Sequence, residues 1–447
     1  MDFDYLNKLL TDKDFARLKQ EIENHPVQDT AEYIDSLDDR DALVVFRLLP
    51  KDIASDAFSY LSSDRQSEIS GLVNESELSE ILSDLYFDDK IDFLEEMPAY
   101  LVSKILKNTS SVERKMINQF LNYPEYSAGS LMTIEYVGLK KELTIGSALD
   151  LIKRTAPDKE TIYTCYVIDR ERHLEGTISL KDLVLADDHR SVDDVMQKDV
   201  IFVYTHDDQE YTANIFKKYD LLALPVVDTE KRLVGIITID DIVDVIEEEA
   251  TEDILKMAAV RPTDEEYIHA GVYKLARKRI VWLMVLMVSA TFTGYIIRSF
   301  EDTLQSVVVL AAFIPMLMDT GGNAGAQAST LVIRSIVLGE VKFTDMLRII
   351  WKEFRISLLV GASLAVLNFL RIYFLEANTF AIAFTVALTL MLTVMIAKIT
   401  GGILPLIAKK IKLDPAIMAS PLITTIVDAF ALVIYFYLAN LILGLHV

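Results

Sequence analysis

The spacing of apolar positions changes twice along the chain, and each of the three resulting patterns predicts a different kind of structure. Up to about residue 126, leucine, isoleucine and phenylalanine recur every three to four positions, which is typical of short amphipathic helices. Between residues 131 and 249, short apolar runs of strand length alternate with helical segments. Beyond residue 271, the apolar runs are long enough to cross a membrane. We therefore expect a multidomain protein rather than one globular body.

The first, helical segment contains a weak internal repeat. The runs LLPKDIASDAF (48–58) and EMPAYLVSKIL (96–106) resemble each other, and each places a proline near a helix start, where its missing N–H does least harm. Such repetition predicts an α-helical superhelical stack. An ordinary helical bundle is the alternative that the pattern leaves open.

The middle segment contains one pattern twice. TCYVIDRERHLEGTISLKDLVLA (164–186) matches LPVVDTEKRLVGIITIDDIVDVI (224–246), and both read as an apolar strand, an acidic turn, a second strand and a helix. The motif G-x-x-[ST]-x-x-D joins the second strand to the helix, at Gly176, Ser179 and Asp182 and again at Gly235, Thr238 and Asp241. This duplication resembles a tandem pair of CBS domains, which implies an α/β fold.

The cleft of CBS pairs often takes adenine nucleotides, which makes ATP a candidate ligand. The resemblance assigns the phosphates to the hydroxyl side chains and the ribose hydroxyls to the carboxylates, in keeping with their donor and acceptor chemistry. The candidate nucleotide-binding residues are Ser179, Asp182, Thr238 and Asp241. A pair that serves only as a dimerisation platform is the alternative.

The C-terminal segment contains five apolar runs that we expect to be membrane-spanning helices: 280–297, 304–333, 356–370, 380–407 and 417–443. We expect the glycine-rich stretch DTGGNAGAQAST to interrupt the second run. Basic residues concentrate in alternate connecting loops. By the positive-inside rule, this pattern predicts a cytoplasmic N-terminus and an extracytoplasmic C-terminus.

Charge divides the chain at the same point as hydropathy. The whole sequence has a net charge of −23, but residues 1–270 carry 58 acidic and 29 basic side chains, whereas the remainder carries 9 and 15. Nucleic acid is not an expected partner, because its binding requires a basic face. The single cysteine, Cys165, excludes a disulfide framework and a cysteine-based zinc site.

Carboxylates are densest immediately before the membrane segment. The run DDIVDVIEEEATED (240–253) contains no basic residue, and helical spacing aligns Asp241, Asp244 and Glu248 on one face. Like charges at this spacing repel one another, so the row favours counter-ions, and hard divalent cations such as Mg²⁺ or Ca²⁺ suit carboxylates best. A solvated acidic helix is the alternative.

Ionisable residues within the apolar runs are functional candidates, because a charge at membrane depth is costly. Asp319 and Asp428 are the clear cases, and Lys398 is a weaker third. Asp319 opens the glycine-rich stretch, whose polar residues suit an ion path along a discontinuous helix. Helix-packing contacts between small residues are the alternative explanation for the glycines.

The order of these segments resembles the MgtE family of magnesium channels and transporters. The family motifs are present as PMLMDTGGNAGAQASTLVIR (315–334) and LDPAIMASPLITTIVDAFALVIY (413–435). The resemblance implies a homodimer with the pore between its subunits, five membrane helices in each, and a cytosolic part that responds to bound Mg²⁺. The implied domains are an N-terminal helical domain (1–128), tandem CBS domains (129–250), a linker helix (251–272) and a transmembrane domain (273–447).

The resemblance also implies roles for individual residues. Asp428 is the pore carboxylate, and Asp414, at the start of the last span, meets an ion near the linker helix. Asp319 stands where some members have glycine. The remaining candidate Mg²⁺ ligands are acidic residues of the cytosolic part: Asp88, Asp92, Asp208, Glu210, Asp220, Asp241, Asp244, Glu249, Glu252 and Asp253.

These observations predict Mg²⁺ uptake across the plasma membrane, limited by cytosolic Mg²⁺ and modulated by ATP. Mg²⁺ holds its water ligands tightly, so a pore would best recognise the hydrated ion through carboxylate and carbonyl oxygens. A CBS-regulated transporter of Co²⁺ or Ni²⁺ is the alternative. An enzyme is not expected, because the apolar runs lack the YD and GxGD motifs of intramembrane aspartyl proteases, and the sequence has neither an HExxH motif nor a Walker A loop.

Overall fold

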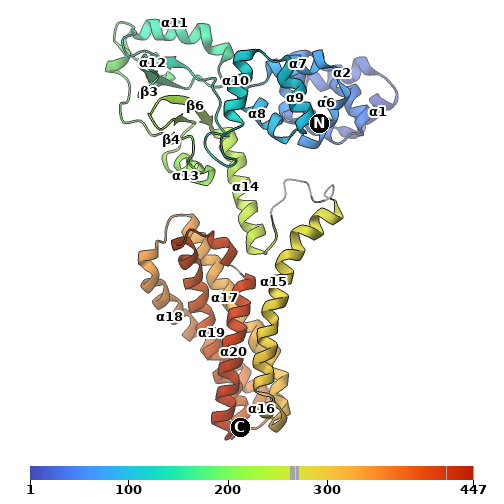
Figure 1. Cartoon of the computed structure of the whole chain (residues 1–447), viewed down its shortest axis with the longest axis vertical. Helices are drawn as coiled ribbons and strands as arrows, with labels where there is room; N and C mark the ends of the chain where they lie inside the picture. Colours follow the sequence, from blue (N-terminus) through green and yellow to red (C-terminus); the bar gives the residue numbers. More distant parts are fainter. Residues whose placement is uncertain (262–266, 268–270, 419, 446–447) are drawn as a thin grey trace. The chain divides into compact units, whose positions relative to one another are not determined.

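The computed structural model describes residues 1–261, 267, 271–418 and 420–445. The chain divides into two compact units, Met1–Ile246 and Glu247–Val447 (Figure 1). The first unit holds the helical segment and both copies of the α/β pattern, and the second holds the long apolar helices.

Short helices form a stack through the first part of the first unit. They are α1 (Phe3–Thr11), α2 (Phe15–Glu23), α3 (Val27–Asp35), α4 (Asp39–Phe46), α5 (Lys51–Ser59), α6 (Ser63–Leu72), α7 (Glu75–Asp84), α8 (Phe87–Glu96), α9 (Ala99–Asn108) and α10 (Ser111–Phe120). In one row α3 packs on α5, α5 on α7 and α7 on α9, and in the other α4 packs on α6 and α6 on α8. This arrangement confirms the superhelical stack. Pro50 and Pro98 are the N-cap residues of α5 and α9, as expected.

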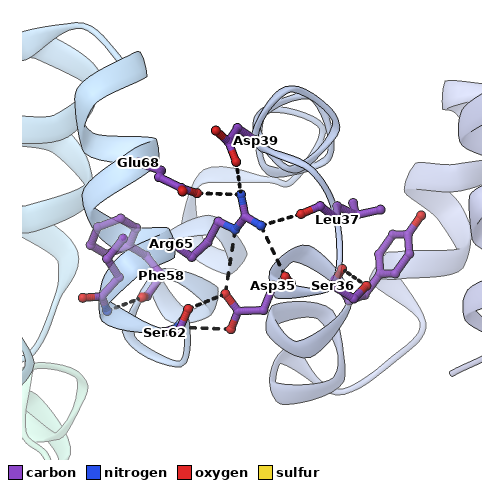
Figure 2. Close-up of polar contacts among 10 residues, drawn as sticks. Asp35, Ser36, Leu37, Asp39, Phe58, Ser62, Arg65 and Glu68 are labelled. Carbon is purple, nitrogen blue, oxygen red and sulfur yellow. Dashed lines mark hydrogen bonds and ion pairs between the residues drawn. The ribbon is translucent and has the colours of Figure 1, made fainter. Parts of the chain in front are cut away.

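Arg65 joins α6 to the turn between α3 and α4 (Figure 2). Its side chain is buried, and the guanidinium donates to the backbone carbonyls of Asp35 at 3.3 Å and of Leu37. The same group pairs with the carboxylates of Glu68 at 2.8 Å and Asp39 at 3.4 Å. A buried charge is tolerated when it is paired and hydrogen-bonded in this way. The network therefore fixes the position of α6 in the stack.

The described residues contain two three-stranded sheets with the same topology. The first comprises β1 (Gly138–Leu139), β2 (Thr164–Ile168) and β3 (Leu174–Ser179), and the second β4 (Val203–Tyr204), β5 (Ala223–Val227) and β6 (Leu233–Thr238). In each sheet the first pair of strands is parallel and the second antiparallel. The accompanying helices are α11 (Ile145–Thr155), η1 (Ala156–Asp158), α12 (Leu180–Leu185), η2 (Val192–Asp194), α13 (Gln209–Tyr219) and α14 (Ile239–Met257). The predicted duplication is confirmed.

The motif glycine permits the same close approach in both copies. A Cβ at Gly176 would lie 2.7 Å from Met196 Sδ, and a Cβ at Gly235 would lie 2.5 Å from the backbone oxygen of Thr133. Thr133 belongs to the segment 131–149, which opens the first copy, and Met196 to the segment 195–213, which opens the second, so each glycine is approached by the opening segment of the other copy. The two copies therefore pack closely at both glycines, and at Gly235 a side chain would collide with the backbone of the other copy.

Five helices of the described residues are long and apolar enough to cross a membrane, and all lie in the second unit. They correspond to the five predicted spans. The elements of this unit are α15 (Val272–Ser299), α16 (Glu301–Ser306), η3 (Val308–Phe313), α17 (Ile314–Val337), η4 (Phe343–Asp345), α18 (Met346–Leu370), η5 (Arg371–Leu375), α19 (Phe380–Lys410), η6 (Pro415–Met418) and α20 (Ser420–Leu443).

The course of α17 corrects one expectation. The glycine-rich stretch does not interrupt the second span, because it lies inside a continuous helix from Ile314–Val337. Its glycines instead allow close packing. A Cβ at Gly325 of α17 would lie 2.5 Å from Ile423 Cγ2 of α20, and a Cβ at Gly401 of α19 would lie 2.2 Å from the Gly325 carbonyl oxygen. The small residues thus bring α17, α19 and α20 together, as in other membrane bundles.

The predicted linker helix 251–272 is represented by the end of α14. This helix begins at Ile239, directly after β6, and ends at Met257. Residues 262–266 and 268–270 lie outside the described residues. The third span is longer than predicted, since α18 begins at Met346.

Candidate functional site

Asp428 lies on α20, eight residues after Ser420, or about 12 Å along the helix axis. Its side chain is partly exposed. The preceding residue, Val427, is buried against α17, where a Cβ at Gly321 would lie 2.9 Å from Val427 Cγ1. This packing brings Asp319 of α17 close enough for its carboxylate to repel that of Asp428. The structure therefore brings the two predicted intramembrane aspartates together.

Lys398, the third ionisable candidate, has a different environment. It is buried on α19 and interacts electrostatically with Glu353, which is buried on α18. A buried charge is strongly destabilising unless an opposite charge accompanies it. The opposite charge of Glu353 nearby offers an explanation for Lys398 that needs no ion path.

Asp414 lies immediately before η6, and its carboxylate contacts the end of α14. The carboxylate accepts a hydrogen bond from Lys256 Nζ at 2.6 Å and another from the backbone N–H of Ala416 at 2.8 Å. Lys256 Nζ also lies 2.6 Å from Glu252 Oε1. Asp253 lies beside them, and burial, followed by the charge of Asp414, raises the pKa of this carboxyl. Three predicted ion ligands, Glu252, Asp253 and Asp414, are thus brought together around a lysine.

The first unit contains a second group of carboxylates, which we term the α8–α14 cluster. Three chain segments contribute to it: α8, the loop after η1, and the start of α14. Glu160 Oε2, in the loop, is buried and has no hydrogen-bond partner among the described residues. The members are Asp88, Asp89, Asp92, Glu160, Asp240 and Asp241.

Burial and mutual repulsion raise the pKa values in the α8–α14 cluster. Burial, followed by the charge of Asp241, raises the pKa of Asp88 well above its usual range and also raises the pKa of Asp92. Burial and the carboxylates of α14 raise the pKa of Glu160 to about 7. The pKa of Asp241 rises to about 6, chiefly through burial. A bound divalent cation would relieve this repulsion, and carboxylate oxygens are the ligands that Mg²⁺ prefers.

The two motif pairs of the duplicated domains have matching hydrogen bonds. Ser179 Oγ donates to Asp182 Oδ2 at 2.6 Å, and Thr238 Oγ1 donates to Asp241 Oδ2 at 2.8 Å. Ser179 also accepts the backbone N–H of Asp182 at 3.0 Å and so caps α12. Asp241 therefore belongs both to a motif pair and to the α8–α14 cluster.

The remaining predicted ligands lie on α13 and α14. Asp208 is exposed and caps α13 by accepting the backbone N–H of Glu210 at 2.9 Å. Asp220 ends α13 in a left-handed conformation, and Asp244 and Glu249 lie on α14. Among the residues that the structure describes, no three carboxylate, imidazole or thiol groups form a ready-made metal site.

Comparisons with known proteins agree with this arrangement. A family model described as a divalent cation transporter, MgtE, matches residues 314–438. A model of the MgtE intracellular N domain matches residues 25–126, and a CBS domain model matches residues 128–189 and 192–248. The magnesium transporter MgtE of Thermus thermophilus is 37% identical over 442 residues, which cover 98% of this chain and 98% of that protein. The chain belongs to the MgtE family of magnesium transporters.

Further MgtE proteins extend the likeness. The magnesium transporter MgtE of Bacillus subtilis is 34% identical over 93% of this chain and 94% of its own length. A solved structure of the soluble part of a magnesium transporter covers 56% of this chain and 98% of its own, at 33% identity and a TM-score of 0.52. The cytosolic domain of the Mg²⁺ channel MgtE in complex with ATP covers 54% of this chain and 98% of its own, at 38% identity and a TM-score of 0.51. The chain is therefore a multi-pass membrane protein of a transporter family and not an enzyme.

Three residues of this MgtE chain take part in the clusters although the sequence pattern does not single them out: Asp89, Glu160 and Lys256. Asp89 directly follows Asp88, so its position offers a signal. Lys256 is spaced four residues from Glu252, which also predicts an ion pair on a helix. Glu160 has no such signal, because only the tertiary fold brings it to α8 and α14.

Proposed function

We propose that this MgtE chain forms a homodimer in the plasma membrane and conducts Mg²⁺ through a pore lined by Asp428 of both protomers. The observation that carries the proposal is the position of Asp428, a carboxylate within an apolar helix that is still partly exposed on the single chain. A charge at membrane depth is costly unless it faces protein or water. A second protomer with an aqueous path between the two would supply that environment.

Hydrated Mg²⁺ is the ion that this arrangement suits. Mg²⁺ gives up its water reluctantly and prefers octahedral oxygen coordination. Two Asp428 carboxylates, one from each protomer, attract the ion and bind it through its water ligands. Asp319 adds a second negative charge nearby, which raises the local concentration of cations.

The proposal includes control by cytosolic Mg²⁺. As its concentration rises, ions bind to the α8–α14 cluster and to the carboxylates of Glu252, Asp253 and Asp414, with Asp208, Glu210, Asp220, Asp244 and Glu249 as further ligands. Each bound ion offsets repulsion and favours a compact form in which the pore is closed. A decisive shift between two states requires a differential binding free energy of about 5.5 kcal/mol, which several sites together can supply. Mg²⁺ thus limits its own entry.

We further propose that ATP binds at the CBS cleft. The support is the motif pairs and the likeness to a cytosolic MgtE domain that was solved with ATP. Because Asp241 belongs to both the motif and the α8–α14 cluster, ATP and Mg²⁺ should change each other's affinity reciprocally. The basic loops support a cytoplasmic first unit and an extracytoplasmic C-terminus.

Mg²⁺ uptake into liposomes tests the pore. Asp428→Ala removes both pore carboxylates of the dimer, so we expect uptake to fall by about two orders of magnitude, the effect of a few kcal/mol at membrane depth. Asp302→Ala, a carboxylate of α16, is the matched control and should retain uptake. Competition by Ca²⁺, Co²⁺ and Ni²⁺ measures selectivity. Wild-type uptake by an Asp428→Ala protein that elutes as a folded dimer would refute the assignment.

A further inference from the structure

A lysine is held between two of the candidate ion ligands of the second unit. Lys256 Nζ lies 2.6 Å from Glu252 Oε1, one turn earlier on α14, and 2.6 Å from Asp414 Oδ2, before η6. The Lys256 side chain is only 24% exposed. It therefore fills the space between the two carboxylates instead of extending into solvent.

The charges around Lys256 keep it protonated. Burial lowers the pKa of Lys256, but hydrogen bonds to Asp414 and Glu252 outweigh burial and raise the pKa above its usual range. Asp253 adds a third carboxylate, which interacts with Asp414, Glu252, Lys256 and Arg334. The group around Lys256 thus contains its own fixed cation at every physiological pH.

We propose that Lys256 is a built-in counter-ion that competes with Mg²⁺ for the carboxylates of Glu252 and Asp414. Carboxylate oxygens bind Mg²⁺ at about 2.0–2.1 Å, or through one of its water ligands. Either mode uses the oxygens and the space that the ammonium group occupies. Mg²⁺ can therefore bridge Glu252 and Asp414 only after Lys256 has left them.

The competition bears on the Mg²⁺ concentration at which the channel responds. The inference rests on the proposed Mg²⁺ gating and adds the residue that sets its threshold. Two charge-assisted hydrogen bonds must break for each ion bound, so the apparent affinity is lower than that of the same carboxylates without Lys256. Removal of Lys256 should lower the Mg²⁺ midpoint about five- to tenfold, as expected for two partly exposed ion pairs.

Neutral substitutions of Lys256 in the full-length protein test the proposal. Lys256→Met retains an apolar chain of similar length without the charge, and Lys256→Gln is a second neutral variant. One readout is the Mg²⁺ concentration that gives half-maximal protection from limited proteolysis, which needs no transport. The other is the Mg²⁺ concentration that half inhibits uptake into liposomes. We expect both midpoints to fall in the neutral variants and to stay near the wild-type value in Lys256→Arg.

Lys412→Met is the matched control. Lys412 is exposed and stands two residues before Asp414, so its substitution removes a nearby charge without removing the ammonium group between the carboxylates. Unchanged midpoints in both neutral variants, an equal shift in Lys412→Met, or higher midpoints in the neutral variants would each overturn the proposal. If Mg²⁺ fails to protect the wild-type protein at all, the gating proposal falls together with this one. If Mg²⁺ protects the wild-type protein but the neutral Lys256 variants show no shift in midpoint, only the proposed competition by Lys256 is overturned.

Discussion

The α8–α14 cluster and the group around Lys256 accommodate crowded carboxylates in opposite ways. In the α8–α14 cluster, the charged neighbours that raise the pKa values of Asp88 and Glu160 are themselves carboxylates. In the other group, Lys256 lies between Glu252 and Asp414 and offsets their charge. The difference teaches that acidic density alone does not define an ion sensor. Carboxylates that repel one another are stabilised by a proton or by an added cation. Carboxylates that already pair with a lysine must lose that contact before they can bind a metal ion.

The largest effect should come from removing the repulsion in the α8–α14 cluster. Asp88→Asn together with Glu160→Gln replaces two buried carboxylates by neutral groups of the same shape. Without Mg²⁺, we expect the free energy of unfolding to rise by about 2–4 kcal/mol, because a tenfold change in the proton affinity of a carboxylate corresponds to about 1.4 kcal/mol. The stabilisation that Mg²⁺ confers on the wild type should largely disappear. Thermal unfolding of the full-length protein in detergent, with chelator or with millimolar Mg²⁺, measures both.

Asp158→Asn is the control for this pair, because Asp158 is exposed and lies two residues before Glu160. It should leave both the stability and the Mg²⁺ response as in the wild type. A double variant that unfolds at a lower temperature than the wild type, or that is stabilised by Mg²⁺ as strongly as the wild type, would show that Mg²⁺ does not bind at the α8–α14 cluster.

The raised pKa values of the α8–α14 cluster should also make the stability of the protein depend on pH, with a smaller effect than the double substitution. A carboxyl group whose pKa is raised by folding binds protons more tightly in the folded state, so stability is greatest at low pH and falls as pH rises. With the pKa of Asp241 at about 6, that of Glu160 at about 7 and that of Asp92 at about 8, Mg²⁺-free protein should lose stability between about pH 4 and pH 8. Millimolar Mg²⁺ should flatten this slope, as should the Asp88→Asn, Glu160→Gln pair. An Mg²⁺-free unfolding temperature that rises across this interval would contradict the assignment.

The smallest effect should come from Asp414→Asn. Lys256 retains its pair with Glu252 in this variant, so the free energy of unfolding should change by no more than about 1 kcal/mol. Salt should reduce the difference further, because partly exposed charges are screened. Denaturant unfolding at low and high ionic strength gives the measurement. A loss of about 3 kcal/mol or more would mean that Asp414 belongs to a fully buried pair instead.

Much of this fold can be predicted from local signals in the sequence. The duplicated motif with Gly176 and Gly235 predicts the paired sheets, because a glycine is needed where the opening segment of the other copy approaches. Long apolar runs predict the five membrane helices, because a helix in lipid must satisfy its own backbone hydrogen bonds. The glycine-rich stretch wrongly predicts an interruption, since glycine favours turns in water but close helix packing in a membrane.

The candidate sites are predictable only in part. Asp428 can be selected as a candidate because a carboxylate within an apolar run is costly, and Asp241 because its motif occurs twice. Glu160 cannot be found from the sequence, because its contribution depends on three segments meeting in space. The spacing of Lys256 from Glu252 predicts one of its ion pairs, whereas only the fold brings Asp414 to the same lysine.

The stacked helices of the first unit have a mechanical consequence. Each helix from α3 to α7 packs on the helix two places further along the chain, so stability accumulates from neighbour to neighbour. Such a stack can bend through small adjustments at many helix–helix interfaces without the loss of any one of them. The hydrogen bonds of Arg65 restrict this bending near α3 and α4, whereas α8 lies further along the stack. The repulsion among the carboxylates on α8 therefore acts on a part of the stack that the Arg65 contacts do not hold directly.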